Sequence, residues 1–357
     1  MTGFCIPFQA DGFPPGFPST GRLPCSWPAL LRSAASLAGS TVGAGRTATA
    51  WLPGNVLEFA WRTALVGANL RQQRHRGPIQ ALRQTGQYRS LDPSEKGAVS
   101  FFLGQVSAKH FAEHLLAAPV FARVDAAMQA AGLPLTGRRP DFYGWGPTVG
   151  AFAVEAKGRS GIWNNHTMQQ AKKQAQLLAP VLGGGGHAAV AHMAYFERRE
   201  WKAWLMDPPP SRQGPGPSLE SVLVAYYRPF ERLLAERGAG QVEVLAGAEY
   251  DMAELPEVDV RLGLRRDLRA AFTQEGLADE GRGAKLKLAL AGLGGAGEEG
   301  EAFAQVRSRL DRAARLAEEE TAERRSAGTD GLLLQAGPSW EPELMLLEPD
   351  QRPSAGG

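Results

Sequence analysis

The feature that most constrains the fold is a change in the spacing of apolar residues between positions 92 and 207. Asp92-Pro93-Ser94-Glu95 supplies a capping residue and a first-turn proline, and the apolar residues that follow recur at helical spacing. From residue 138 onward, short runs of small and β-branched residues are bounded by Gly and Pro, which is typical of strands. The order helix, helix, strand, strand, helix, strand, strand predicts an α/β fold with a mixed central sheet flanked by helices.

We expect five segments along the chain, of which one carries this core. Residues 1–50 are rich in Pro, Gly, Ser and Ala without clear periodicity, which favours a disordered or poorly ordered tail. The other segments are a helical extension at 51–91, the α/β core at 92–210, an α/β extension at 211–275, and an Ala-, Glu- and Arg-rich helical or disordered tail at 276–357. The core is therefore predicted to have helical additions on both its N-terminal and C-terminal sides.

Composition excludes several classes of protein. The sequence contains no run of 18 apolar residues, so we expect no membrane-spanning helix. Met1 to Asp11 carries no basic residue and lacks a signal-peptide pattern. The 2 cysteines, Cys5 and Cys25, are too few for a four-cysteine zinc site and argue against a disulfide framework. A reducing, cytoplasmic setting is therefore expected.

The net charge of +2 conceals an uneven distribution along the chain. Residues 1–160 hold 16 Lys and Arg against 8 Asp and Glu, whereas residues 161–357 hold 23 against 29. A basic first half is compatible with a polyanionic partner, and scattered surface arginine is the simpler alternative.

Two acidic residues and a lysine form the most informative pattern. Asp141 follows a proline at the start of an expected short strand, and the turn Gly144–Pro147 leads into a second strand that contains Glu155 and Lys157. Alternate residues of a strand share a face, so the side chains of Glu155 and Lys157 point the same way. If the two strands pair as a hairpin, Asp141, Glu155 and Lys157 meet at one end of the sheet.

This grouping predicts a magnesium site, with Mn²⁺ as the alternative ion. Two carboxylates tolerate each other when they share a hard cation, and the carbonyl of Ala156 can add a third oxygen. Such a cation polarises a phosphodiester, and Lys157 can orient or help to deprotonate the attacking water. Lys157 is one of three Lys among the first 160 residues, against 13 Arg, which suggests that an ammonium is required there.

Pro140-Asp141 with Glu155-Ala156-Lys157 resembles the motif of the PD-(D/E)xK nuclease superfamily, whose fold is restriction-endonuclease-like. The resemblance implies a metal-dependent nuclease with Asp141, Glu155 and Ala156 as metal ligands. In many members the helix after the motif brings a Gln or Lys to the site. The implied candidates here are Gln170 first and Lys173 second. Some members add a glutamate from the first core helix, and the candidates for it are Glu95 and Glu113.

Residues beside the motif suit a nucleic-acid partner, with DNA favoured over RNA. Arg138, Arg139 and Arg159 can hold phosphates, and Trp163 can stack on a base. Ordinary surface charge and packing of Trp163 onto the core are the alternatives. No membrane partner is expected, and a homodimer is left open.

Two other functions compete with a nuclease. The same fold can serve as a non-catalytic module that binds nucleic acid or protein without a metal. Alternatively, His110-Phe111-Ala112-Glu113-His114 matches the HxxEH pattern of a zinc metallopeptidase family. There His110 and His114 would bind zinc, Glu113 would be the general base, and Glu197 or Glu200 would be the third ligand.

Overall fold

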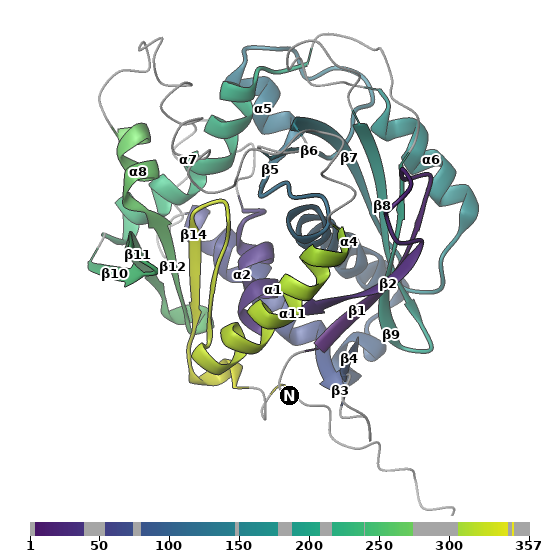
Figure 1. Cartoon of the computed structure of the whole chain (residues 1–357), viewed down its shortest axis with the longest axis horizontal. Coiled ribbons are helices and arrows are strands. Elements are labelled where there is room, and N and C mark those ends of the chain that lie inside the picture. The colour runs from purple at the N-terminus through teal and green to yellow at the C-terminus, as the bar shows by residue number, and fades with distance from the viewer. Residues whose placement is uncertain are drawn as a thin grey trace, which may run out of the picture.

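The computed structural model describes residues 4–38, 54–73, 80–146, 150–177, 188–207, 216–238, 240–273, 306–341 and position 345. Within these ranges the chain is an α/β protein with two sheets. Figure 1 shows helices α1, α2, α4 and α11 between the two sheets, and α6 on the outer face of the larger sheet. The α/β class with a mixed sheet flanked by helices is confirmed.

The larger sheet is mixed and has nine strands in the described part of the chain. Their spatial order is β2-β1-β4-β9-β8-β7-β6-β5, with β3 paired to β4. The pairs β7–β8, β1–β9 and β1–β4 are parallel, and the other pairs are antiparallel. The strands are β1 Phe4–Asp11, β2 Thr20–Cys25, β3 Leu70–Gln73, β4 Gln80–Gln84, β5 Val120–Arg123, β6 Phe142–Gly146, β7 Gly150–Gly158, β8 Ala188–Glu197 and β9 Glu200–Met206.

The smaller sheet is antiparallel and is built from the second half of the chain. Its order is β10-β11-β12-β14-β13, and α7 packs against it. Its strands are β10 Gln241–Leu245, β11 Ala248–Leu255, β12 Val260–Arg265, β13 Arg325–Ala327 and β14 Leu332–Ala336. The helices are α1 Trp27–Ala35, α2 Gly54–Asn69, α3 Gly86–Ser90, α4 Pro93–His114, α5 Val124–Ala130, α6 Asn165–Ala175, α7 Leu219–Arg237, α8 Arg266–Thr273 and α11 Val306–Glu323, with 3₁₀ turns η1 Pro256–Val258 and η2 Pro338–Trp340.

Helix α4 is the central helix of the predicted core and packs against β7 and β8. Asp92 accepts hydrogen bonds from Ser94 N and Glu95 N, while Glu95 accepts one from Asp92 N, so both halves of a capping box are present. The second half of the helix is buried against β7 and β8. Gly104 permits this contact, because a Cβ at that position would lie 2.6 Å from the carbonyl oxygen of Lys157.

The prediction of a disordered tail at residues 1–50 is wrong for the part that the structure describes. Strand β1 pairs with β2, β4 and β9 inside the larger sheet, and every residue of α1 is buried. The cause is visible in β1, where Phe4, Ile6 and Phe8 are buried and alternate with less buried residues. Residues 39–50 of that predicted tail lie outside the described residues.

Two further boundaries need correction. Residues 51–91, expected as a helical extension, also supply β3 and β4 of the larger sheet. Residues 306–340 of the expected C-terminal tail form α11, β13 and β14, and β14 pairs with β12 in the smaller sheet. The apolar run Leu332–Leu334 is buried in this pairing, which explains why the segment is part of the fold. The described parts of the 211–275 extension are α/β, as expected.

Local boundaries inside the core also shift. The second helix of the predicted order, which we expect at 120–131, begins instead as the four-residue strand β5 and becomes helical only at Val124. The expected strand at 138–143 begins at Phe142 instead and runs through Gly146, so the predicted turn at 144–147 is largely strand. Asp141 therefore lies immediately before β6. In the described part of the chain, no helix is both long enough and apolar enough to cross a membrane.

A buried group of four charged side chains joins the N-terminal, central and C-terminal segments. We call Arg32, Lys109, Glu113 and Asp330 the charge cluster. Arg32 binds Glu113 at 2.9 Å and Asp330 at 3.4 Å, while Lys109 lies 3.2 Å from Glu113 and 3.3 Å from Asp330. Each of these four side chains is at most 4% exposed. Two cations face two anions, so the buried charge is balanced.

Removing one member of this cluster should cost far more than removing a surface ion pair. Arg32→Ala leaves two buried carboxylates short of a cation, so we expect the free energy of unfolding to fall by about 3–5 kcal/mol in urea denaturation. Arg324→Ala is the control, because Arg324 pairs with Glu341 on the surface and should change stability by about 1 kcal/mol or less. Equal effects of the two substitutions would contradict the structural role of the cluster.

Candidate functional site

The ends of β6 and β7 bring the predicted residues together. The two strands pair antiparallel, with Phe142 opposite Val154, which confirms the expected hairpin. Beyond this pair, a side chain takes the place of a backbone acceptor between the two strands. Oδ2 of Asp141 accepts a hydrogen bond of 3.0 Å from Ala156 N. The carbonyl of Ala156 points to the same edge as its N–H, since both groups of an extended residue face one neighbouring strand. Asp141, Glu155 and Ala156 therefore meet where β6 begins.

Glu155 is fully buried on the face of β7 that α6 covers. Its Oε1 forms an ion pair with Lys157 Nζ, and its Oε2 is buried without a hydrogen-bond partner. The Lys157 side chain remains 29% exposed. A buried carboxyl oxygen without a partner is costly, and Glu155 Oε2 is the one carboxyl oxygen in that state among the described residues.

The pKa values of both carboxyl groups are raised above their ordinary values. Burial first and the charge of Asp141 second raise the pKa of Glu155 to about 8, although Lys157 works to lower it. Burial also raises the pKa of Asp141, against the lowering effects of the hydrogen bond from Ala156 and the charge of Lys157. The electrostatics are thus those of an acid pair that lacks enough positive charge.

These residues fit a hard divalent cation. Asp141, Glu155 Oε2 and the Ala156 carbonyl are the oxygens that could bind such an ion at this end of the sheet, and Mg²⁺ commonly uses one or two carboxylates with water in its remaining positions. No group of three or more His, Cys, Asp or Glu side chains that could hold a metal is present among the described residues, and the candidate site has two, Asp141 and Glu155.

Helix α6 contributes a different glutamine from the one expected. Met168, Ala171 and Ala175 form its buried face, as the apolar spacing predicts. Gln170 is exposed and hydrogen-bonds His166, and Lys173 is also exposed. Gln174 instead donates a hydrogen bond of 2.9 Å to the carbonyl of Arg139, two residues before Asp141. One helical turn separates Gln174 from Gln170, and sequence alone did not show which turn faces the site.

The glutamates suggested from the first core helix have other roles. Glu95 completes the capping box at the exposed start of α4. Glu113 belongs to the charge cluster, where Arg32 and Lys109 hold its pKa well below the ordinary value although burial works to raise it. Neither residue has a described contact with Asp141 or Glu155.

The basic residues beside the motif differ in their exposure and in whether their side chains already have partners in the protein. Arg138 is exposed, whereas Arg139 forms an ion pair with Asp125. Arg159 donates hydrogen bonds to the carbonyl of Ile162 at 3.0 Å and to Thr167 Oγ1 at 3.1 Å. Its guanidinium therefore orders the loop after β7, a role that the sequence did not predict.

The HxxEH motif lies in the protein interior. His110 is fully buried, and its ring lies 4.4 Å from that of His114. Burial, assisted by neighbouring cations, lowers the pKa of His114 to about 4. Glu113 is held by Arg32 and Lys109, so it is not free to act as a general base. The expected third ligands, Glu197 and Glu200, pair with Lys202 on the β8–β9 hairpin. This arrangement does not favour a zinc peptidase.

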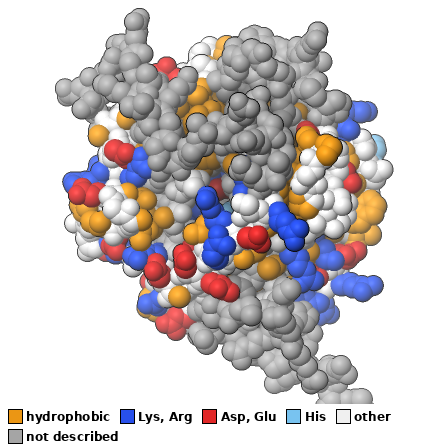
Figure 2. Space-filling model, viewed as in Figure 1, with side chains coloured by type: hydrophobic (Ala, Val, Ile, Leu, Met, Phe, Trp, Pro, Cys, Tyr) orange, Lys and Arg blue, Asp and Glu red, His pale blue; other side chains and the backbone are white. Residues whose placement is uncertain are grey.

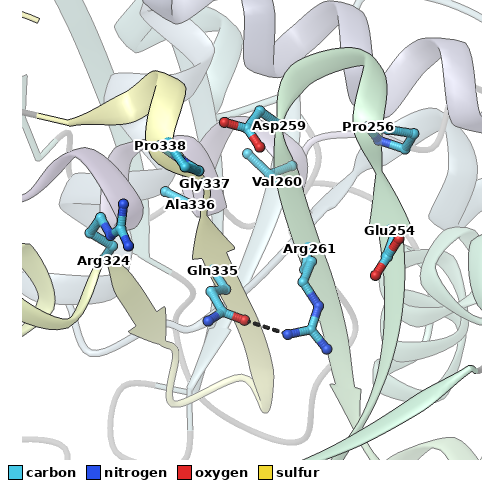
Figure 3. Close-up of a pocket in the computed structure, with 10 residues that line it drawn as sticks. All are labelled: Glu254, Pro256, Asp259, Val260, Arg261, Arg324, Gln335, Ala336, Gly337 and Pro338. Carbon is cyan, nitrogen blue, oxygen red and sulfur yellow. Dashed lines mark hydrogen bonds between the residues drawn. The ribbon is translucent and has the colours of Figure 1, made fainter. Parts of the chain in front are cut away.

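A pocket of about 370 Å³ lies at the end of the smaller sheet (Figure 3). Its charged residues are largely engaged with the protein itself: Arg261 donates to Gln335, and Asp259 accepts a hydrogen bond of 2.7 Å from Ser339 N. Gly337 is required beside that carboxylate, because a Cβ there would lie 2.0 Å from Asp259 Oδ1. These contacts join β12 to the segment after β14, so we assign them a structural role.

No family model, no curated protein and no solved structure matches the chain. The site must therefore be interpreted from its own geometry.

The raised pKa of Glu155 predicts how stability depends on pH and on metal. Folded Glu155 keeps its proton up to about pH 8, whereas its ordinary pKa is 4.5, so stability should fall as pH rises between these values. Mg²⁺ or Mn²⁺ needs the ionised carboxylate, so the metal should raise the melting temperature more at about pH 9 than at about pH 6.

Glu155→Gln removes the ionisable group and tests both effects. We expect this variant to gain on the order of 1–3 kcal/mol at about pH 9 and to lose the metal-dependent stabilisation. Differential scanning calorimetry with and without the metal measures the shifts. A wild-type melting temperature that does not respond to either metal at any pH would argue against the cation site.

Proposed function

We propose that the protein is a metal-dependent nuclease of the restriction-endonuclease-like class, which hydrolyses phosphodiester bonds in DNA rather than RNA. The observation that carries the proposal is the fully buried Glu155, with the half-buried Asp141 and with Lys157 beside it and one of its carboxyl oxygens left without a partner. If Glu155 served only in a structural ion pair, there would be no reason for its Oε2 to lack a hydrogen-bond partner.

The order of the surrounding elements supports this proposal. Strands β6 and β7 form a hairpin, α6 crosses over to the parallel strand β8, and β9 returns antiparallel. The nuclease superfamily that the motif resembles places its acidic pair and lysine on such a hairpin, followed by a helix and two strands. The restriction-endonuclease-like core is therefore part of the proposal.

The residues have distinct tasks in the proposed reaction. Asp141, Glu155 Oε2 and the Ala156 carbonyl would hold Mg²⁺ or Mn²⁺, which stabilises negative charge on the scissile phosphate. The Lys157 side chain is partly exposed and its Nζ lies beside Glu155, so its ammonium can donate hydrogen bonds to a water molecule or a phosphate oxygen at the acid pair. Gln174 fixes the backbone two residues before Asp141, and thereby positions that carboxylate.

Charge around the site favours a polyanionic substrate. Residues 156–196 contain four basic residues, Lys157, Arg159, Lys172 and Lys173, and no Asp or Glu. Figure 2 shows basic side chains gathered over the β9 end of the larger sheet, and acidic ones on the opposite part of this face, over α11. A basic surface over the larger sheet would attract an anionic strand.

Cleavage assays test the proposal directly. We expect Mg²⁺- or Mn²⁺-dependent cleavage of DNA, and a loss of at least about 100-fold for Asp141→Asn, Glu155→Gln and Lys157→Met, because each removes a ligand or the ammonium. Comparing DNA and RNA substrates of the same sequence tests the preference for DNA.

The chain offers its own control for these variants. Glu200-Trp201-Lys202 repeats the acid-x-Lys spacing on β9, with Lys202 24% exposed and 3.8 Å from Glu200. Lys202→Met should leave cleavage unchanged. Cleavage that survives all three site substitutions would refute the site. DNA binding without cleavage, independent of metal, would support the non-catalytic binding module instead.

A further inference from the structure

We propose that the loop 159–163, which joins β7 to α6, binds unpaired bases, so that the substrate has single-stranded bases beside the scissile bond. This inference rests on the proposed nuclease function. It identifies the class of DNA that the site would accept.

The loop presents two large apolar side chains to solvent. Ile162 is 62% exposed and Trp163 is 43% exposed. They follow Lys157 by five and six residues, directly after the strand that carries the acid pair. Large apolar side chains exposed together next to a candidate site are typical of a surface that binds a ligand.

Hydrogen bonds hold the loop in this exposed arrangement. The backbone of Arg159 donates to Ala194 O at 2.9 Å, and Phe196 N donates to Gly161 O at 3.2 Å, so the first three residues of the loop are attached to β8. The Arg159 side chain fixes the carbonyl of Ile162 from within. Because the loop is ordered in advance, a ligand that binds Ile162 and Trp163 does not have to bear the entropic cost of ordering it.

The register of the sheet places Trp163 near the proposed site. Lys157 pairs with Met193, and Met193 pairs with Trp204, so these residues lie in a row across three strands on one face. Neighbouring strands are about 4.8 Å apart, which puts Trp204 roughly 10 Å from Lys157. The Trp163 ring packs edge-to-face against Trp204, with 5.3 Å between centroids. The separation of roughly 10 Å between Lys157 and Trp204 corresponds to about three base steps, each about 3.4 Å in a duplex, and Trp163 lies next to Trp204.

The chemistry of the loop fits unpaired bases better than a duplex or a protein. The surrounding stretch of residues 156–196 has basic residues and no acidic ones, which suits a strand of phosphates. Bases stack on exposed aromatic rings with about 1–3 kcal/mol each, but in a duplex their faces are already covered by neighbouring bases. Insertion into a duplex would first require unstacking, which costs a few kcal/mol.

Binding measured without metal tests the inference separately from catalysis. With EDTA present, we expect the wild type to bind a fluorescein-labelled single-stranded oligonucleotide more tightly than the matching duplex. Trp163→Ala should weaken single-strand binding by about tenfold or more, and Ile162→Ala by a smaller factor, with little change for the duplex. Quenching of tryptophan fluorescence by the unlabelled single strand should be smaller in Trp163→Ala than in the wild type.

Two substitutions elsewhere are matched in exposure. Trp61 on α2 is 44% exposed and Val244 on β10 is 62% exposed, so Trp61→Ala and Val244→Ala remove similar surface from other elements. Both should bind single-stranded DNA as the wild type does. Circular dichroism and melting temperature show whether each variant is folded.

The outcomes separate this inference from the proposed function. Single-strand binding by Trp163→Ala at the wild-type level would overturn the inference, as would an equal loss in Trp61→Ala. Loss of self-association in Trp163→Ala, seen by sedimentation with DNA binding unchanged, would overturn it in favour of a protein partner. If base binding depends on Trp163 but the wild type never cleaves DNA, the loop assignment is supported and the nuclease function fails.

Discussion

The fold depends on burying the charge cluster in balanced form. Arg32 comes from α1, Lys109 and Glu113 from α4, and Asp330 from the turn before β14. Removing such groups from water costs several kcal/mol per ion unless partners and hydrogen bonds replace the lost hydration. Tyr226 and Tyr227 on α7 supply two of these bonds, to Asp330 Oδ2 and to its backbone carbonyl. Segments from both halves of the chain must therefore be in place together, and the smaller sheet is fixed to the larger one through α1 and α4.

The candidate site, unlike the charge cluster, does not balance its carboxyl groups with an equal number of cations. In the charge cluster two cations balance two anions, and Glu320 nearby accepts hydrogen bonds from Ser26 and Ser326. At the end of β7, two carboxyls share one lysine, and Glu155 Oε2 has no partner although the residue is fully buried. The same chain thus satisfies its structural carboxylates and leaves this one incomplete. The proposed metal site accounts for this incomplete carboxylate, because a bound cation would supply the missing partner.

Local patterns allowed part of this structure to be predicted, and long-range contacts account for the rest. The hairpin that contains Asp141 and Glu155 and the buried stripe of α6 follow from periods of two and of 3.6 residues. Composition misled the interpretation of the first fifty residues, because the alternation of Phe4, Ile6 and Phe8 was the stronger signal. The role of residues 306–340 could not be predicted from their own sequence pattern. It depends on contacts such as that between Arg32 and Asp330, which are 298 residues apart in sequence.

Short motifs in this chain acquire meaning only from their surroundings. The HxxEH letters at 110–114 would suit zinc on an isolated helix, but Arg32, 81 residues before Glu113, occupies the carboxylate. The acid-x-Lys spacing occurs at both Glu155 and Glu200, with similar lysine exposure, 29% and 24%. Only the carboxylate of Glu155 is fully buried beside a second acid, and only there is the pKa raised to about 8. Burial next to a like charge, rather than the triplet of letters, is therefore what distinguishes a place where a cation would bind from an ordinary surface pair.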